Sequence, residues 1–527
     1  MTKIIGFLIT KENKKINIDF FNVGLKMLIL KHSGYYIYLW GIGDIENYKI
    51  NNKYSLSFPL HDSLLDRNVL LYFEDEKIIV ENDWLGSIPI FYNPKAQIVS
   101  TISNFCIRDK SINNEGLANF CEFGYSVFEQ TMFTDIKFMR YFSKLIISNN
   151  EIKIEYKIDP AIQDDFLTKV SAEDDVIELM QEYISSIESK INGEIIIPTS
   201  GGYDSRLLNY LIKDKRRIRS FTYGISKDQS KSTEVVHAKK ISEIYNTKWD
   251  QIELKDYYNY IDKWFSIYGI STHLHGMYHI EFYKKILQKY KFKSPTLLSG
   301  IIGDAWAEYG KFNNVINYND VINLGYTHGL NLNLDYLKIN YESTIKITFY
   351  EKYRKILNND KLKAIFSMRI KLILLSYLTQ IPEYFGMPVW TPFLNFDIVR
   401  SILNINDKRR IKRIWERDFF RKVGLNLEDM GLKSIKSNQL DYAVAKNFKF
   451  EPIDIDLMAE FIDKKRLFEV NKCLSRVNLF EVLKNELLFI PKIGGIMRRI
   501  GYENNYLKAL YEYFVIKAIE KGLKYES

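Results

Sequence analysis

The chain has 527 residues and a mass of 62.4 kDa, which exceeds one ordinary hydrophobic core and suits two packed domains. Hydrophobic residues make up 46% of the chain and charged residues 26%, so a disordered, collagen-like or coiled-coil protein is excluded. The formal net charge of +9 is a mild bias for a protein of this size. Because no basic tail stands out, we expect no binding of nucleic acid.

The cysteines and the hydropathy pattern indicate the cellular compartment of the protein. Cys106, Cys121 and Cys473 lie far apart without a CxxC pair, which predicts neither a disulfide framework nor a thiolate metal site. No run of about 18 apolar residues occurs, and the first residues lack the pattern of a signal peptide. We therefore expect a cytoplasmic protein that does not cross a membrane. The oligomeric state is left open, with a homodimer as one alternative.

Residues 1–160 are predicted to form a strand-rich domain. Short apolar or alternating runs separated by turn residues recur throughout it. The expected strands are residues 4–10, 35–40, 69–73, 77–80, 88–92, 98–101, 144–147 and 152–156. The last two flank Ser148-Asn149-Asn150-Glu151, which predicts a hairpin. Residues 157–170, which include Pro160, are predicted to hold the domain boundary.

Residues 161–527 change to alternating strands and helices. Apolar runs predict strands at 194–199, 218–223, 248–254 and 295–299, and 3.6-residue periodicity predicts helices at 204–213, 234–246, 257–268 and 277–290. Such alternation is typical of βαβ units, so we expect a doubly wound α/β domain with a parallel sheet. From about Tyr336 onward the periodicity is almost all helical, which predicts a helical C-terminal extension.

The most specific motif is Ser200-Gly201-Gly202-Tyr203-Asp204-Ser205, which follows an apolar strand and opens a helix. Two glycines let backbone N–H groups close around phosphate oxygens, and the helix directs its positive end toward them. Ser200 and Ser205 add hydroxyl donors, and Asp204 supplies a carboxylate for Mg²⁺. No Gly-Lys-Ser/Thr follows, so this is not a Walker A loop. The alternative is a plain Gly-Gly turn between a strand and a helix.

This motif resembles the pyrophosphate loop of the ATP pyrophosphatases, and its continuation Arg206-Leu207-Leu208 is similar to the asparagine synthetase branch. A second match is Ser299-Gly300-Ile301-Ile302-Gly303-Asp304, whose aspartate lies five residues after the serine, as in that branch. The resemblance covers Val176–Gly310 well and the helical remainder loosely. It implies ATP and Mg²⁺ as cofactors, a metal shared by Asp204 and Asp304, and phosphate contacts from Ser299, Gly300 and Gly303. It also implies that the adenine lies against residues 221–224, which include Thr222 and Tyr223, and against Ile197 or Pro198. For Phe221 and Tyr223, ordinary sheet packing is the alternative.

The resemblance implies a reaction in two steps. A carboxylate attacks the α-phosphorus of ATP, which gives an acyl-adenylate and pyrophosphate, and an amine or ammonia then displaces AMP. The two carboxylates would stabilise the departing pyrophosphate through a shared Mg²⁺. The partners expected from this chemistry are a small-molecule carboxylate and a small-molecule amine.

The N-terminal domain is also similar to that family. The segment from Asp83 to Tyr92 resembles part of the glutaminase domain of asparagine synthetases, an N-terminal-nucleophile (Ntn) fold with αββα layers. That domain works through a cysteine directly after the initiator methionine, and here the position holds Thr2. We therefore expect a degenerate glutaminase-like scaffold that makes no ammonia, with an active Thr2 as the disfavoured alternative.

The second domain departs from the family at several positions. The ammonia-using members carry glutamates where this chain has Ile301 and Ala305, and an aspartate where it has Asn395. The family places a lysine beyond that segment to neutralise the reacting phosphate, and the spacing makes Lys436 the candidate, with Lys433 behind it. A solvated lysine is the alternative.

Histidines and arginines complete the candidate residues. His273, His275 and His279 cluster just before the helix that leads to the second loop, so His275 or Tyr278 could act as general base in an acceptor pocket. Zinc binding is the less favoured alternative, because no fourth ligand has a recognisable spacing. A group of C-terminal arginines is expected to form a solvated basic face rather than a site for an anionic acceptor: Arg409, Arg410, Arg413, Arg417, Arg421, Arg498 and Arg499.

Two other functions compete with an amide-forming ligase that hydrolyses no glutamine. One is an asparagine synthetase fed by free ammonia, against which the missing glutamate at Ile301 argues. The other is a non-catalytic scaffold protein that binds nucleotide. ATP binding without pyrophosphate release would distinguish the scaffold from the ligase.

Overall fold

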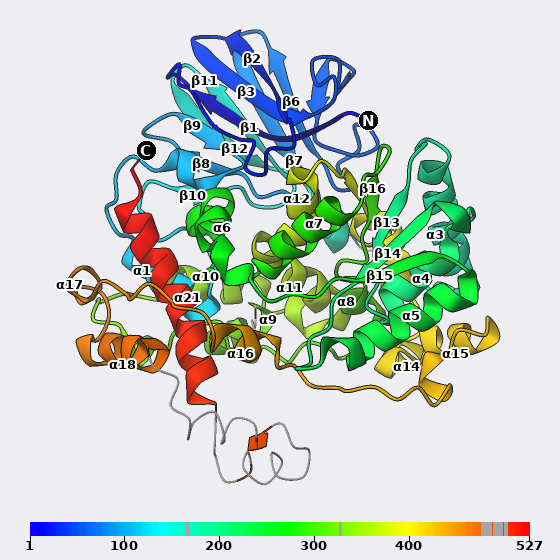
Figure 1. Ribbon diagram of the computed structural model, residues 1–527. Helices are drawn as coiled ribbons and strands as arrows, with labels where there is room; N and C mark the ends of the chain where they lie inside the picture. The colour runs from blue at the N-terminus through cyan, green and yellow to red at the C-terminus, as the bar shows by residue number, and fades with distance from the viewer. Residues whose placement is uncertain (164–168, 326–328, 476–486, 489–498, 500–503, 527) are drawn as a thin grey trace.

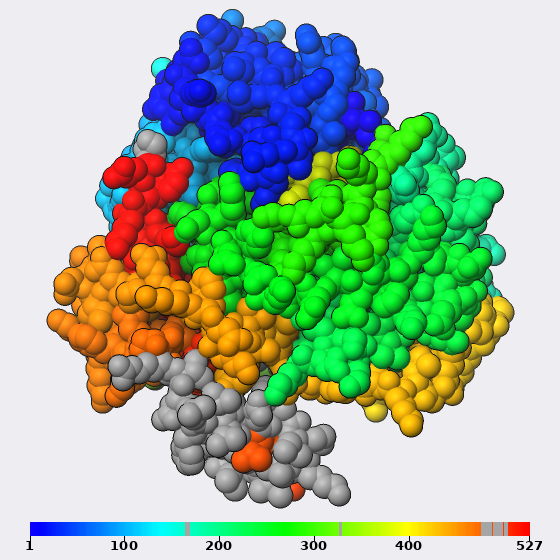
Figure 2. Space-filling model, in the orientation of Figure 1, coloured from blue at the N-terminus to red at the C-terminus, as the bar shows by residue number. Residues whose placement is uncertain are grey.

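The computed structural model describes residues 1–163, 169–325, 329–475, 487–488, 499 and 504–526 (Figure 1). It is an α/β protein with antiparallel sheets in its N-terminal part and a parallel sheet with helices in the rest. In Figure 2 the start of the chain, drawn in blue, lies at the top of the molecule against the rest of the chain.

Two six-stranded antiparallel sheets build the N-terminal part. The first has the order β10-β8-β9-β1-β3-β2. Its strands are β1 (Lys3–Thr10), β2 (Lys26–His32), β3 (Tyr35–Ile42), β8 (Phe91–Asn93), β9 (Ile98–Ser100) and β10 (Lys137–Phe138). The second has the order β12-β11-β7-β6-β5-β4. Its strands are β4 (Lys49–Ile50), β5 (Lys53–Ser55), β6 (Val69–Glu74), β7 (Lys77–Asn82), β11 (Ser143–Ser148) and β12 (Glu151–Tyr156).

The sheets pack on each other through alternating side chains. Phe7 and Leu39 of the first sheet share a hydrophobic cluster with Leu71 and Leu145 of the second. The opposite face of the first sheet packs against α1 (Asn114–Phe123) and a larger cluster. All eight residues of β1 are therefore buried.

The predicted hairpin is confirmed. Ser148 pairs with Glu151, and the two residues between them, Asn149 and Asn150, have φ of 48° and 62°. Two consecutive positive φ values are the geometry of a tight turn that matches the twist of the strands, and asparagine tolerates it. The expected strand at 88–92 begins only at Phe91, and β2, β4, β5 and β10 were not expected.

Five parallel strands form the sheet of the second part. Their order is β15-β14-β13-β16-β17. They are β13 (Ile195–Pro198), β14 (Ile218–Thr222), β15 (Lys248–Gln251), β16 (Thr296–Leu298) and β17 (Val389–Trp390). The chain runs outward from β13 to β15 and then returns to the other side of β13. The strand order thus reverses between β13 and β16, where open α/β sheets bind their ligands.

Helices cover both faces of this sheet. Ile195 and Ile197 point into a cluster with α3 (Glu173–Glu188), α4 (Tyr203–Leu211) and α13 (Phe396–Leu403). Ile196 points the other way, into the largest cluster, which includes residues of α7 (Tyr278–Lys289). A strand buried on both faces explains the continuous apolar run in the sequence.

The remaining α-helices agree with the expected helical segments, except for α8 and α9, which were not expected. They are α5 (Thr233–Tyr245), α6 (Ile261–Tyr268), α8 (Gly303–Ala307), α9 (Ile322–Gly325), α10 (Thr344–Tyr353), α11 (Asp360–Leu375), α12 (Tyr377–Tyr384), α14 (Asp407–Arg410), α15 (Ile414–Lys422), α16 (Leu440–Ala445), α17 (Ile455–Met458), α18 (Lys464–Ser475) and α21 (Asn505–Lys524). The expected helix at 257–268 is divided into a 3₁₀ turn, η5 (Tyr257–Tyr260), and α6.

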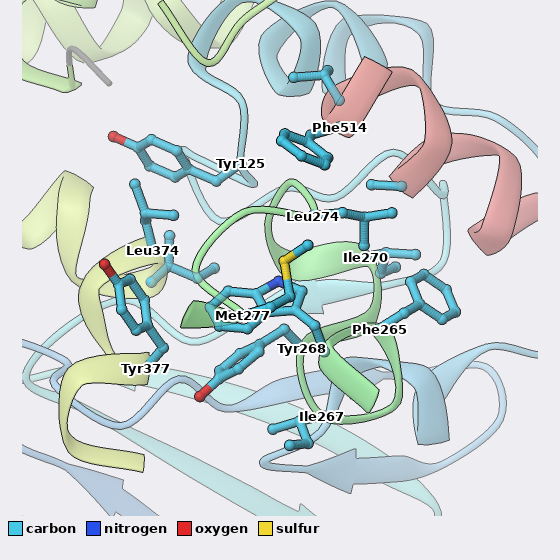
Figure 3. Packing of buried hydrophobic residues seen from close by; sticks show 14 of the residues in the cluster. Tyr125, Phe265, Ile267, Tyr268, Ile270, Leu274, Met277, Leu374, Tyr377 and Phe514 are labelled. Carbon is cyan, nitrogen blue, oxygen red and sulfur yellow. The ribbon is translucent and has the colours of Figure 1, made fainter. Parts of the chain in front are cut away.

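The largest hydrophobic cluster joins distant parts of the chain. Figure 3 shows Tyr125 of the N-terminal part, Tyr268, Tyr377 of α12 and Phe514 of α21 around one core. The architecture changes between β12 and α3, yet residues on both sides of that change share this core.

Charged residues also cross between the two parts. Lys3 of β1 and Arg67 both pair with Glu383 of α12, with Lys3 Nζ 3.1 Å and Arg67 Nη1 2.8 Å from the same carboxylate oxygen. Arg67 Nη2 donates to the second oxygen over 3.0 Å. In a separate contact, Arg369 of α11 makes a bidentate ion pair with Asp159, at 2.6 and 2.8 Å.

One helical stretch, Asp360–Tyr384, is long and apolar enough to cross a membrane. Within its most apolar window, 72% of the stretch is buried inside the protein. Because the core helix of a globular protein has the same properties, this stretch is weak evidence for a membrane span.

Candidate functional site

The first candidate loop follows β13 and begins α4. Gly201 has φ of +74°, and a Cβ there would lie 2.2 Å from the Cβ of His237, so the turn requires glycine. The N–H of Ser200 donates to Ser205 Oγ over 3.2 Å, and the N–H of Gly202 donates to Ser200 Oγ over 3.4 Å. Gly202 is exposed and caps α4 without a side-chain hydrogen bond. The loop therefore presents polar backbone at the positive end of a helix.

The second candidate loop follows β16. It lies across from the first loop at the place between β13 and β16 where the strand order reverses, which we call the switch point. Ser299 is anchored by its N–H to the carbonyl of Trp390 over 3.0 Å, and its Oγ accepts from Ile301 N over 3.2 Å. Ile302 has φ of +55°, a conformation that a β-branched residue rarely adopts. Gly303 leaves room for the first loop, because a Cβ there would lie 2.8 Å from Asp204 Cγ.

The two loops meet at Asp204 and Asp304. The backbone N–H of Asp304 donates to Asp204 Oδ2 over 3.1 Å. The Cα position of Gly300 also faces Asp204, since a Cβ there would lie 3.3 Å from the aspartate Cβ. Residues one hundred positions apart thus place two carboxylates side by side at the carboxyl ends of β13 and β16.

Each carboxylate is paired with a cation. Arg413 Nη2 contacts Asp204 Oδ1, and Lys311 Nζ contacts Asp304 Oδ2. Arg413 also donates to buried Glu416 over 2.9 Å and lies 5.0 Å above the Tyr203 ring. These residues form one charged network of two cations and three carboxylates.

Burial and pairing shift the titration of this network. Burial raises the pKa of Asp204, although the Arg413 guanidinium opposes the rise. At Asp304 the nearby Lys311 ammonium outweighs the effect of burial and lowers the pKa of the carboxyl group. Burial raises the pKa of Glu416, even beside Arg413. A bound cation would hold all three carboxylates ionised.

Lys436 lies beside the first loop. Its neighbour Ile435 donates its N–H to the carbonyl of Lys231 over 2.7 Å and accepts from Thr233 N over 3.2 Å. Lys436 is exposed, and within the described residues it forms no ion pair. Burial lowers the pKa of His237, with a smaller contribution from the charge of Lys436. Because His237 packs on Gly201, this places Lys436 within electrostatic reach of the loop.

The residues expected near the adenine are engaged in packing. Thr222 Oγ1 donates to the carbonyl of Thr199 and accepts from Trp249 Nε1 over 3.0 Å. The Tyr223 ring lies 5.9 Å from Tyr278 and 5.3 Å from Phe282. Burial in this cluster raises the pKa of Tyr223.

His275 and Tyr278 belong to the same aromatic cluster. His275 Nε2 lies 3.1 Å from Asp441 Oδ2, and the hydroxyl groups of Tyr278 and Tyr377 are 2.9 Å apart. Burial raises the pKa of Tyr278 well above its usual value, so this phenol stays protonated. Asp441 also accepts from Tyr257 over 2.9 Å and from Tyr511 over 3.3 Å. Three side chains thus converge on one carboxylate.

One segment connects Lys436 to Asp441. The N–H groups of Gln439 and Leu440 both donate to the carbonyl of Ile225, at 2.7 and 3.0 Å, just beyond β14. The segment therefore runs along the carboxyl end of the sheet, from the side of the first candidate loop to the histidine side. Candidate residues from both sides are brought to the same edge.

The sequence did not mark several members of the site. Arg413 was grouped with a solvated basic face, which is wrong for Arg413 and for fully buried Arg410. Arg410 donates to the carbonyl of Trp306 over 2.9 Å. Arg498 lies outside the described residues. Lys311, Glu416 and Asp441 were not predicted either. Lys311 and Glu416 belong to no recognised motif, and Asp441 lies 166 residues from its partner His275.

No group of three or more His, Cys, Asp or Glu side chains suited to a metal ion occurs in the described part of the chain. The histidine cluster likewise offers no such group. His273 is fully buried, and both of its ring nitrogens lack hydrogen-bond partners among the described residues.

No family model matches the chain, and no curated protein matches it.

Proposed function

We propose that this protein is an ATP-dependent, amide-forming ligase related to the asparagine synthetases. It would activate a carboxylate as an acyl-adenylate with release of pyrophosphate, and then transfer the acyl group to an amine or ammonia without hydrolysing glutamine. The observation that carries the proposal is the 3.1 Å contact between Asp304 N and Asp204 Oδ2 at the switch point of a parallel sheet. This is the place and the chemistry that a metal-bound triphosphate requires.

The pair Asp204 and Asp304 fits Mg²⁺. Magnesium is usually held by one or two carboxylates together with phosphate oxygens and waters, rather than by a complete protein cage. The two neighbouring carboxylates provide that partial set, and Gly303 keeps the space between them free of a Cβ. When bound there, Mg²⁺ would neutralise charge that develops on the departing pyrophosphate.

The loop residues would bind the phosphates. The Ser200 and Ser205 hydroxyl groups and the N–H groups at the start of α4 are donors, and the helix end is positive. Ser299 and Gly300 contribute the facing loop. Arg413 and Lys311 lie directly beside the carboxylates and offer cationic donors to phosphate oxygens.

The histidine side suits the second step. A proton on His275 Nε2 would point at Asp441, which leaves Nδ1 to accept a proton from the attacking amine. His275 is a better base than Tyr278, because burial keeps that phenol protonated. In this step the amine nitrogen forms a bond to the acyl carbon, the bond to AMP breaks, and the amine proton passes to His275. Lys436 could neutralise the phosphate of the departing AMP.

The N-terminal part would serve as an Ntn-like scaffold. The Thr2 hydroxyl accepts a hydrogen bond from Asp44 N over 3.2 Å. The next residue, Lys3, is fully buried and paired with Glu383. These contacts suit a structural role for the start of the chain.

The proposal is tested by pyrophosphate release over a panel of carboxylic acids and amines with Mg²⁺·ATP. We expect Asp204→Asn to lower the rate by at least ~100-fold, because it removes charge where the transition state needs it. Asp397→Asn is the matched control, since Asp397 is exposed and also lies in the first turn of a helix. Equal rates for Asp204→Asn and the parent would overturn the assignment.

Other outcomes of the same screen separate the alternatives. Activity with aspartate and ammonium salts alone would indicate an ammonia-fed asparagine synthetase. ATP binding without pyrophosphate release for any acid would indicate a nucleotide-binding scaffold. Formation of glutamate from glutamine would contradict the role given to Thr2.

A further inference from the structure

A cavity of ≈ 90 Å³ lies between the N-terminal part and the helices α10 and α11. Room for one water takes about 10–15 Å³ on this scale, so the cavity can hold a small organic molecule. Its walls are mainly aromatic and aliphatic, and include Phe128, Phe138, Tyr141, Phe349, Tyr353 and Phe366. None of its lining residues belongs to the two candidate loops or to the start of the chain around Thr2.

Three charged residues interrupt these apolar walls, and one of them is fully neutralised. Arg369 makes its bidentate pair with Asp159 and donates twice to the carbonyl of Trp84, at 3.2 and 2.9 Å. Its guanidinium also stacks on Tyr141, 3.7 Å from the ring centre. Arg369 therefore ties the cavity walls together and has little capacity left for a ligand.

Arg140 differs, because its guanidinium makes a single hydrogen bond within the described part of the chain. Its guanidinium lies between Tyr141 and Tyr156, 4.6 and 4.9 Å from the ring centres, and donates to the Tyr141 hydroxyl over 3.1 Å. Its Nε is buried and has no hydrogen-bond partner among the described residues. A buried guanidinium donor without a partner is costly unless a ligand supplies the acceptor.

Glu129 is the opposite charge in the same wall. One of its oxygens accepts from the Tyr156 hydroxyl over 2.9 Å, and no cation lies within ion-pair distance in the described part of the chain. Burial raises the pKa of this carboxyl group. Glu129 and Arg140 thus line one cavity without forming an ion pair with each other.

The backbone beneath Glu129 is strained. Phe128 and Glu129 have φ of 55° and 62°, consecutive left-handed conformations without glycine. The turn is held by hydrogen bonds from Gln130 N to the carbonyl of Val127 over 3.1 Å and from Phe138 N to that of Glu129 over 3.3 Å. Strain of this kind persists where the surrounding structure fixes it, and it is frequent at ligand-binding positions.

We propose that this cavity binds a free amino acid with an apolar side chain. The ligand carboxylate would pair with Arg140, its ammonium group with Glu129, and its side chain would contact Phe349 and Phe366. A ligand with a single charge would leave the other protein charge unpaired, so a zwitterion fits best. The site is separate from the proposed ligase centre and does not depend on its activity.

Isothermal titration of the full chain, without nucleotide or metal, tests the proposal. The probes are L-leucine and L-phenylalanine, with phenethylamine and 3-phenylpropionate as analogues that keep only one of the two charges. We expect at least one amino acid to bind, and each analogue of a binding amino acid to bind roughly tenfold or more weakly. Absence of binding by both amino acids, or equally tight binding of the analogues, would overturn the proposal.

Variants assign each charge to its partner. Arg140→Gln should weaken binding of 3-phenylpropionate and the amino acids roughly tenfold and leave phenethylamine unchanged. Glu129→Gln should do the reverse, weakening phenethylamine and leaving 3-phenylpropionate unchanged. The matched controls are Arg216→Gln and Glu155→Gln, two substitutions at exposed residues. If a variant fails to fold, the comparison of analogues on the parent chain decides the question, and a variant that weakens all ligands equally contradicts the assignment.

Discussion

Two clusters of charged side chains in this protein differ in their access to water. Lys3, Arg67 and Glu383 lie between the N-terminal part and α12, with side chains of Lys3 and Glu383 only 1% exposed. At the switch point, Asp204 and Asp304 are paired with Arg413 and Lys311, yet Asp304 is 48% exposed. Lys3 and Glu383 of the first cluster are closed to water, whereas the second cluster is open to water at Asp304, although its Asp204 and Arg413 are only 19% and 14% exposed. Burial thus separates a structural ion cluster from a candidate binding site of similar composition.

The largest expected effect concerns the cluster of Lys3, Arg67 and Glu383, which we call the closed cluster. Glu383→Gln leaves Arg67 and Lys3 buried without a counter-charge, so we expect the free energy of unfolding to fall by about 3–5 kcal/mol. Urea denaturation followed by circular dichroism measures this. Glu12→Gln, at an exposed pair with Lys14 and Arg108, is the control and should cost less than about 1 kcal/mol. Similar losses in both variants would remove the distinction between the clusters.

A smaller effect on stability is expected at the open cluster, by which we mean Asp204, Asp304, Arg413, Lys311 and Glu416. Arg413→Met removes the partner of Asp204 and Glu416, but burial already raises the pKa of Glu416, so this carboxyl group can take up a proton. We expect little loss of stability and, if the proposed function holds, roughly tenfold or greater loss in affinity for Mg²⁺·ATP, because the phosphate contact proposed for Arg413 is lost. Titration with a non-hydrolysable ATP analogue measures the affinity. A stability loss as large as that of Glu383→Gln, with unchanged nucleotide affinity, would contradict the comparison.

The smaller of the two effects expected at the closed cluster is a pH dependence. Burial lowers the pKa of Lys3 to about 8, against the opposing attraction of Glu383. Between pH 8 and the unfolded value of 10.5, the unfolded chain binds more protons at this lysine, so its contribution to stability rises with pH. We expect a gain of about 1–2 kcal/mol from pH 8 to pH 9.5 in the parent relative to Lys3→Met. Parallel curves for the two proteins would show that Lys3 does not titrate in this range.

Local patterns predicted the elements that have a buried face. The strand β13 and the Gly-Gly turn after it could be predicted from the sequence. A strand that is buried on both faces requires a continuous apolar run, and a positive φ favours glycine. β2 was missed because it is an edge strand, with Met27 and Ile29 largely exposed. β17 has only two residues, too few for any periodicity.

The candidate site divides in the same way. Asp204 and Asp304 each belong to a recognisable loop, so they could be predicted to meet over one sheet edge. Arg413 is 209 residues from Asp204, and nothing in its neighbourhood distinguishes it from the solvated arginines around it. The cavity at Glu129 and Arg140 was also invisible, because its walls come from two parts of the chain that pack together only in the folded protein.

Helix α21 has a consequence for the synthesis of the protein. Tyr513, Phe514 and Ile516 of this helix are buried in the same cluster as Tyr125 and residues of α6 and α7. During synthesis, the apolar residues made earlier cannot be fully buried in this core until residues 505–524 have left the ribosome. At about 5–20 residues per second, the roughly 380 residues between Tyr125 and the start of α21 take some 20–80 seconds to make, during which a chaperone would find those surfaces accessible.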